Sequence, residues 1–275
     1  MHDADIGFIG AGNMARSLIG GLVAGGYPRE RLWAADPDSA QRELAASLGA
    51  AHVVGENAEL VANTDVVVVA VKPQMAREAL VPLKGEVERR RALVISVAAG
   101  IPIAAIESWL GPAVRVVRCM PNTPALVSSG VTAMVPNARI SAADRALAES
   151  IMGSVGRWIW LERESQLDAA TALSGSGPAY FFYFLEAMIE AGCELGLSPE
   201  DSRTLALETA LGASKMAIAA DVEPAALRER VTSPGGTTER ALGVLREGGF
   251  APLVKAAIKA ADARARELAR DFGSQ

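Results

Sequence analysis

The chain has 275 residues, a net charge of −5 and a pI near 5.3, and half of its residues are hydrophobic, with a mean hydropathy of +0.22. This length is long for one hydrophobic core and favours two domains. The acidic balance, without any basic run, argues against nucleic acid as a partner. Cys119, Cys193, His2 and His52 form no cluster with ligand spacing, so no metal site is predicted.

The sequence predicts no targeting or membrane segment. The N-terminus lacks the basic and apolar regions of a signal peptide. The longest apolar stretch, residues 92–106, is interrupted by Ser96, Gly100 and Pro102 and is too short to span a bilayer. We therefore expect a cytoplasmic protein without membrane contact.

Up to about residue 160, apolar strands alternate with helices. Strands apolar on both faces, separated by helices, are typical of a doubly wound, mostly parallel sheet, so we predict an α/β domain at residues 1–162. The predicted strands are residues 5–10, 31–36, 51–54, 65–71, 91–100, 113–120, 130–137 and 157–162. The predicted helices between them are residues 13–24, 39–48, 58–64, 102–110 and 142–152.

The strand pattern disappears after this point, and residues 163–275 are predicted to form an all-α domain. Ser198 has the character of an N-cap and Pro199 suits the first position of the helix that follows. Three further helices are predicted at residues 224–230, 238–247 and 250–270, separated by glycine-rich joints.

A glycine-rich motif, "GAGNMA" at residues 10–15, ends the first strand and opens the first helix. In this context the pattern G-x-G-x-x-A predicts a dinucleotide site. Gly10 permits the tight turn, Gly12 lets the backbone approach a pyrophosphate, and Ala15 allows close packing of helix and strand. The pyrophosphate is expected at the helix N-terminus, where free N–H groups favour anions.

The end of the second strand bears on which cofactor binds. Asp36 is placed to bind the ribose of NADH, whereas Arg42 is near enough to reach the extra phosphate of NADPH. Asp36 is almost equally well explained as the N-cap of the next helix. At the ends of later strands, Lys72 could face either the cofactor or solvent, and Asn122, with Thr123, could donate hydrogen bonds near the nicotinamide.

The remaining chemistry favours an imine substrate over a carbonyl. A carbonyl reductase needs a proton donor, commonly His, Lys or Tyr, and neither His2 nor His52 is suitably placed. An imine nitrogen can be protonated before hydride arrives, so the enzyme needs only to orient the substrate and stabilise its charges.

A second anion site is predicted in "TSPGGTTERAL" at residues 232–242. Gly235 and Gly236 precede a helix start that carries the hydroxyls of Thr237 and Thr238, a combination suited to a carboxylate. Taken alone, the stretch is better explained as a glycine-rich joint with a threonine N-cap. Beside a dinucleotide fold with no other anchor for a substrate, the carboxylate site becomes the better explanation.

Five segments together resemble the pyrroline-5-carboxylate reductase family over residues 5–270. They are "IGFIGAGNMA", "AVKP", "MPNTPA", "LSGSGPAY" and "SPGGTT", in this order and spacing. The resemblance implies an N-terminal Rossmann domain, an all-α C-terminal dimerisation domain, and reduction of 1-pyrroline-5-carboxylate to L-proline with NADPH or NADH. In members that prefer NADPH, other residues often follow the second strand, so Asp36 with Pro37 leaves the choice of cofactor open.

The resemblance also implies site residues. Thr238 is the implied donor to the imine nitrogen, and the substrate-binding residues implied are Glu164, Gly236, Thr237 and Thr238. With the residues derived above, the cofactor-binding set comprises Phe8, Ile9, Gly10, Ala11, Gly12, Asn13, Met14, Asp36, Asn57, Ala70, Val71, Lys72, Pro73, Val97, Ala98, Ala99 and Asn122.

An aromatic run, Tyr180 to Phe184, covers every side of a predicted helix. A helix that is apolar all round must be buried all round, which one small helical domain cannot provide. The pattern and the family together favour a homodimer, with room for a higher assembly, over a monomer with a central core helix.

The alternative functions are a β-hydroxyacid dehydrogenase, another imine reductase and a non-catalytic nicotinamide-binding sensor. A β-hydroxyacid dehydrogenase would carry a catalytic lysine four residues after Gly177, where this chain has Phe181. A non-catalytic nicotinamide-binding sensor would explain the first glycine motif but not the helix start at Thr237.

Overall fold

The structure is a computed structural model that describes residues 3–273, so His2 lies outside the described residues. Of the described residues, those up to Ser176 and those from Ala261 form one compact unit, and residues 177–260 form a second. The predicted boundary after residue 162, between a cofactor-binding domain and a substrate-binding domain, stays a prediction. Among residues 3–273, no helix is both long enough and apolar enough to cross a membrane.

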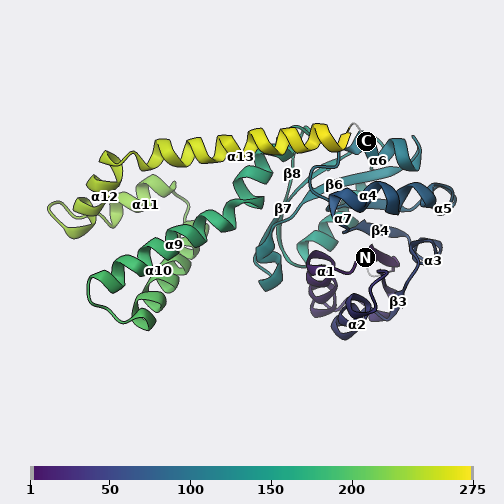
Figure 1. The fold of residues 1–275 in the computed structure, drawn as a ribbon, viewed down its shortest axis with the longest axis horizontal. Coiled ribbons are helices and arrows are strands. Elements are labelled where there is room, and N and C mark those ends of the chain that lie inside the picture. The colour runs from purple at the N-terminus through teal and green to yellow at the C-terminus, as the bar shows by residue number, and fades with distance from the viewer. Residues whose placement is uncertain (1–2, 274–275) are drawn as a thin grey trace. The chain divides into compact units, whose positions relative to one another are not determined.

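The first unit contains one eight-stranded sheet with the strand order β3-β2-β1-β4-β5-β6-β7-β8 (Figure 1). Neighbouring strands pair in parallel, except for the antiparallel pair β6–β7, which confirms the predicted mostly parallel sheet. The strands are β1 (Ile6–Ile9), β2 (Leu32–Ala35), β3 (His52–Val54), β4 (Val66–Val69), β5 (Leu93–Ser96), β6 (Arg115–Met120), β7 (Gly130–Pro136) and β8 (Gly156–Trp160).

Helices and short helical turns connect these strands. The α-helices are α1 (Asn13–Ala24), α2 (Ser39–Leu48), α3 (Asn57–Ala62), α4 (Pro73–Leu80), α5 (Lys84–Arg90), α6 (Ile103–Leu110), α7 (Ala142–Gly153) and α8 (Gln166–Ala170). The short turns are η1 (Arg29–Arg31), η2 (Val81–Leu83), η3 (Thr123–Val127) and the π-helical η4 (Thr171–Gly175). Helices α4 and α5 were not predicted, although the buried residues Ala76, Leu80, Leu83 and Val87 recur at helical spacing.

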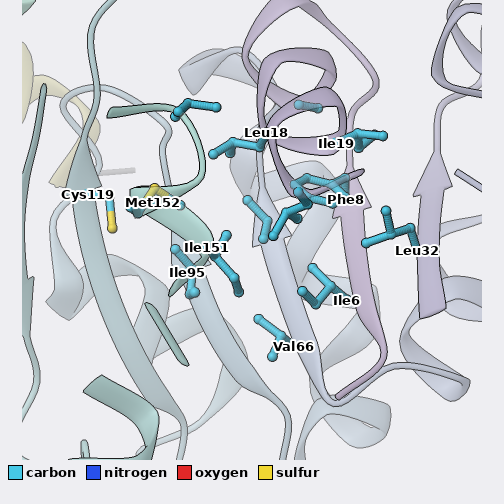
Figure 2. Close-up of a cluster of buried hydrophobic side chains, with 14 of the residues drawn as sticks. Ile6, Phe8, Leu18, Ile19, Leu32, Val66, Ile95, Cys119, Ile151 and Met152 are labelled. Carbon is cyan, nitrogen blue, oxygen red and sulfur yellow. The ribbon is translucent and has the colours of Figure 1, made fainter. Parts of the chain in front are cut away.

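Each face of the sheet has its own hydrophobic core. One core joins the sheet to α1, α2 and α7, and Figure 2 shows Leu18 and Ile19 of α1 close to Phe8 of β1. The opposite core joins the sheet to α3, α4, α5, α6 and α8 and to the end of the final helix. The four residues of β1 are fully buried, as a strand covered on both faces must be.

The second unit, all of whose residues are described, contains only helices, as predicted for this part of the chain. They are α9 (Gly177–Glu194), α10 (Pro199–Ala219), α11 (Pro224–Arg230), α12 (Thr237–Glu247) and the first part of α13 (Phe250–Gly273). Ser198 is the N-cap of α10, where its hydroxyl accepts a hydrogen bond from Asp201 N at 3.0 Å. Within α9, the exposed fraction of Phe181, Phe182 and Tyr183 is between 66% and 75% in the single chain.

Two adjacent glycines of α1 provide a matched test of the packing in the first unit. A Cβ at Gly21 would lie 2.6 Å from Ser154 O and 2.7 Å from Val155 Cγ1, whereas a Cβ at Gly20 would meet no neighbour within 4 Å. We expect Gly21→Ala to lower the free energy of unfolding by roughly 1–3 kcal/mol through overpacking. Gly20→Ala should leave this quantity unchanged or raise it by up to about 1 kcal/mol. Urea unfolding of both variants checks this, and equal shifts would contradict the packing of α1 described here.

Candidate functional site

The first component of the site is the turn between β1 and α1. Gly10 has φ +89°, and a Cβ there would lie 2.9 Å from Val71 Cγ1 and 3.1 Å from the carbonyl group of Ala70. Its N–H donates to Ala35 O at 2.8 Å. Only glycine combines this backbone conformation with such close packing, so Gly10 fixes the turn between the ends of β2 and β4.

The start of α1 has the features of an anion site. Gly12 is the N-cap residue, no side chain caps the helix, and its first turn carries no acidic residue. A Cβ at Gly12 would meet no neighbouring atom within 4 Å, so the backbone is approachable from that side. Ala15 is fully buried against the sheet. These residues fit the pyrophosphate of a dinucleotide, which the helix N-terminus would bind through its N–H groups.

Asp36 lies against this turn and does not cap the next helix. Its carboxylate accepts hydrogen bonds from Ala11 N at 2.9 Å and from Asp38 N at 3.0 Å. Asp38 is the N-cap of α2, with its side chain accepting from Ala40 N. The guanidinium of Arg42 donates to Asp36 O at 2.7 Å. The end of β2, where the sequence predicts the ribose, therefore presents the Asp36 carboxylate with Arg42 beside it.

The other predicted cofactor residues follow the carboxyl ends of neighbouring strands. Asn57 is the first residue of α3, Lys72 is the exposed N-cap of α4, and Val97 continues β5, where its N–H donates to Val69 O at 3.0 Å. Ala98 is buried and Ala99 is exposed. Parallel strands place their carboxyl ends at one edge of a sheet, so these segments belong to the edge that carries the glycine-rich turn.

The side chains of three predicted cofactor residues are already buried or hydrogen-bonded within the protein. Phe8 and Ile9 are fully buried in the two cores, so only their backbone could reach a ligand. Asn122 Oδ1 accepts from Val131 N at 2.9 Å, and Asn122 Nδ2 donates to Ser174 O at 3.1 Å. The Asn122 amide therefore holds the end of β6 against β7 and η4, which leaves one amide hydrogen for any other partner.

Glu164 belongs to the first unit, where it contacts two groups. Its Oε1 accepts from Ile103 N at 2.8 Å and from Arg118 Nη1 at 2.6 Å. The Arg118 side chain is 7% exposed, so the carboxylate neutralises a buried positive charge. It also accepts a hydrogen bond from an N–H at the start of α6. Nearby, burial raises the pKa of Asp168, and the positive charges of Arg118 and Arg266 only partly offset this effect.

The predicted substrate segment lies in the second unit, at the start of α12. Gly236 is the N-cap residue and has no side chain to cap the helix, which excludes the alternative explanation of a threonine N-cap. Within residues 3–273 we find no hydrogen bond from the hydroxyl of Thr237 or Thr238. The first turn contains Glu239, whose carboxylate accepts from Gly235 N at 2.7 Å. The N-terminal N–H groups and the two hydroxyls suit a carboxylate ligand, and Glu239 holds the glycine loop that precedes them.

Three residues near these sites were not foreseen: Arg118, Asp168 and Glu239. An arginine inside an otherwise apolar strand could have indicated a buried ion pair, because an unpaired buried charge is costly. The other two gave no comparable signal. Within residues 3–273, no group of three or more His, Cys, Asp or Glu side chains could hold a metal ion.

The contacts of Glu164 predict an effect on stability. Glu164→Ala would leave Arg118 buried without its partner, so we expect a loss of roughly 2–4 kcal/mol in the free energy of unfolding, since the pair is only partly solvent-screened. Glu164→Gln keeps an acceptor for Ile103 N and should lose less. The exposed Glu162→Ala is the control. Unchanged stability of Glu164→Ala with a raised substrate KM would contradict this structural role.

Two family models and a full-length relative match this chain. Residues 164–268 match a family model described as pyrroline-5-carboxylate reductase dimerisation, and residues 5–100 match one described as NADP oxidoreductase coenzyme F420-dependent. Pyrroline-5-carboxylate reductase from Pseudomonas aeruginosa is 51% identical, over 99% of this chain and 100% of that protein.

Solved structures agree with this assignment. A pyrroline-5-carboxylate reductase from Coxiella burnetii superposes with a TM-score of 0.93 at 42% identity, covering 96% of this chain and 98% of that one. Plasmodium falciparum pyrroline carboxylate reductase with NADP bound superposes with a TM-score of 0.87 at 31% identity, covering 98% of this chain and 99% of that one. With identity of this degree over its full length, the chain belongs to the pyrroline-5-carboxylate reductase family.

Proposed function

We propose that this chain reduces the C=N bond of 1-pyrroline-5-carboxylate to give L-proline, with NADPH or NADH, as the last step of proline biosynthesis. The observation that carries the proposal is the uncapped start of α12, where Gly236 leaves the helix N–H groups and two threonine hydroxyls available. A substrate with a carboxylate beside an imine needs such a site, and a dinucleotide turn is present in the same chain.

The residues at the carboxyl edge of the sheet fit the cofactor. The backbone of Phe8 to Asn13, with Met14, would hold the pyrophosphate, and Asp36 would meet the adenosine ribose. Ala70 to Pro73 and Val97 to Ala99 would contact the cofactor nearer the nicotinamide, with Asn57 and Asn122 at the margins of the site. The nicotinamide supplies the hydride when it is bound.

The substrate would be held by Gly236, Thr237 and Thr238. The N–H groups of the helix start would bind its carboxylate, and the hydroxyl of Thr238 would orient the imine nitrogen or donate a proton to it. Glu164 would contribute through Arg118 and α6, which it holds in place. Orientation and charge compensation are the main demands on the chain, because an imine can be protonated before hydride transfer.

The exposed aromatic face of α9 supports a homodimer formed through the helical unit. Side chains as apolar as Phe181 and Phe182 are rarely left more than half exposed in such a cluster unless a partner covers them. The match to a dimerisation domain supports the same arrangement. We place the protein in the cytoplasm, where its two cysteines would stay reduced.

The role of Thr238 is tested by a pair of substitutions. Thr238→Ala removes one hydrogen bond to the substrate and should lower kcat/KM by about ten- to two-hundredfold, equivalent to roughly 1.5–3 kcal/mol. Thr238→Ser keeps the hydroxyl and should lose much less. The cofactor Kd should not change in either variant, because the cofactor residues lie in the other unit.

The alternative is that Thr238 only stabilises the start of α12. In that case Thr238→Ala would lower the melting temperature and leave kcat/KM close to normal. Measuring both quantities on both variants separates the two roles.

Asp36 is expected to influence the choice of cofactor. A carboxylate at this position repels the extra phosphate of NADPH, so Asp36→Ser should raise the ratio of kcat/KM for NADPH to that for NADH. Asp38→Ser is a matched control, since it removes the same charge two residues away and serine can still cap α2. An unchanged ratio in Asp36→Ser would assign Asp36 to holding the glycine-rich turn alone.

A further inference from the structure

The end of α13 packs on the turn that follows β5. This turn, residues 97–100, is called the β5 turn below. A Cβ at Gly100 would lie 3.0 Å from Phe272 Cδ2 and 3.7 Å from Leu268 Cβ, so the phenyl ring covers the glycine closely. The β5 turn and the end of α13 both belong to the first unit. Phe272 also packs against the core that joins the sheet to α3, α4, α5, α6 and α8.

The β5 turn contains a glycine with a left-handed backbone conformation, and hydrogen bonds hold both of its ends. Gly100 has φ +79°, a conformation that glycine adopts without the strain that a side chain would cause. The strand side of the turn is held by the bond from Val97 N to Val69 O, and the helix side by Glu164 on Ile103 N. Between these points, Ile101 N donates to Ala98 O at 3.5 Å, and Phe272 supplies a close apolar contact at Gly100.

We propose that Phe272 is a positioning residue that holds the β5 turn in the conformation that receives the nicotinamide. The inference rests on the proposed function, in which Val97 to Ala99 contact the cofactor. Phe272 lies outside residues 164–268, so the family model for dimerisation does not include this residue. The last turn of a C-terminal helix frays unless it is docked, which makes this contact sensitive to substitution.

The test uses the full-length protein and NADPH as the probe. Phe272→Ala should raise the Kd for NADPH, measured by the fluorescence of the bound nicotinamide, by about fivefold or more. The KM for 1-pyrroline-5-carboxylate at saturating NADPH should change much less. Phe272→Leu, which still covers Gly100, should give a smaller rise in Kd. Arg264→Ala, at an exposed position of α13 where the side chain pairs with Glu267, is the control and should bind NADPH normally.

A lowered melting temperature with an unchanged Kd for NADPH in Phe272→Ala would show that the ring only fills space, and would overturn the inference. If the alanine variant does not fold, Phe272→Leu decides: a raised Kd supports the inference and an unchanged Kd overturns it.

A separate variant tests the function on which the inference rests. Ala99→Val adds bulk at an exposed position of the β5 turn. If its Kd for NADPH is unchanged, the proposed cofactor contact of this turn is wrong and the inference falls with it. If Ala99→Val weakens NADPH binding and Phe272→Ala does not, only the positioning role of Phe272 is overturned.

Discussion

The close approach of backbone at Gly10 is the constraint on which the cofactor site depends. One residue bonds to the end of β2 and lies against the end of β4, leaving no space for a Cβ. This is the point where the strand order reverses, since the chain runs from β1 to β2 and β3 on one side and returns to β4 on the other. A side chain here would separate the start of α1 from both strand ends, and the carboxylate of Asp36 could no longer reach Ala11 N.

His52 and Cys119 are placed where they cannot serve acid catalysis. His52 begins β3, at the edge of the sheet opposite the cofactor turn, with its ring stacked on Trp33 at a centroid distance of 4.0 Å. Burial raises the pKa of Cys119, so that thiol stays protonated and inert. An imine substrate suits this arrangement, because its reduction needs mainly binding, orientation and charge compensation. The proposed sources of these are the helix N-termini and the threonine hydroxyls.

The sequence predicted features that depend on local pattern. Apolar strands alternating with helices indicated the parallel sheet, and the spacing of Gly10, Gly12 and Ala15 indicated the turn that the structure contains. Contacts between distant residues could not be predicted. Asp36 bonds to Ala11, 25 positions away, and the Glu164 carboxylate bonds to Ile103, 61 positions away. The packing of Phe272 on Gly100 is equally non-local, since side-chain periodicity shows which face of a helix is apolar but not what that face meets.

The central claim is that one chain joins a dinucleotide turn to a carboxylate-binding helix start in order to reduce a cyclic imine. The most direct measurement follows the absorbance of the reduced nicotinamide when 1-pyrroline-5-carboxylate is added to the purified protein, in parallel with NADPH and with NADH, and identifies the product. The account predicts cofactor oxidation that depends on both protein and imine, with one L-proline formed for each cofactor oxidised. Binding of either cofactor without turnover would contradict it and would identify the protein as a nicotinamide-binding sensor.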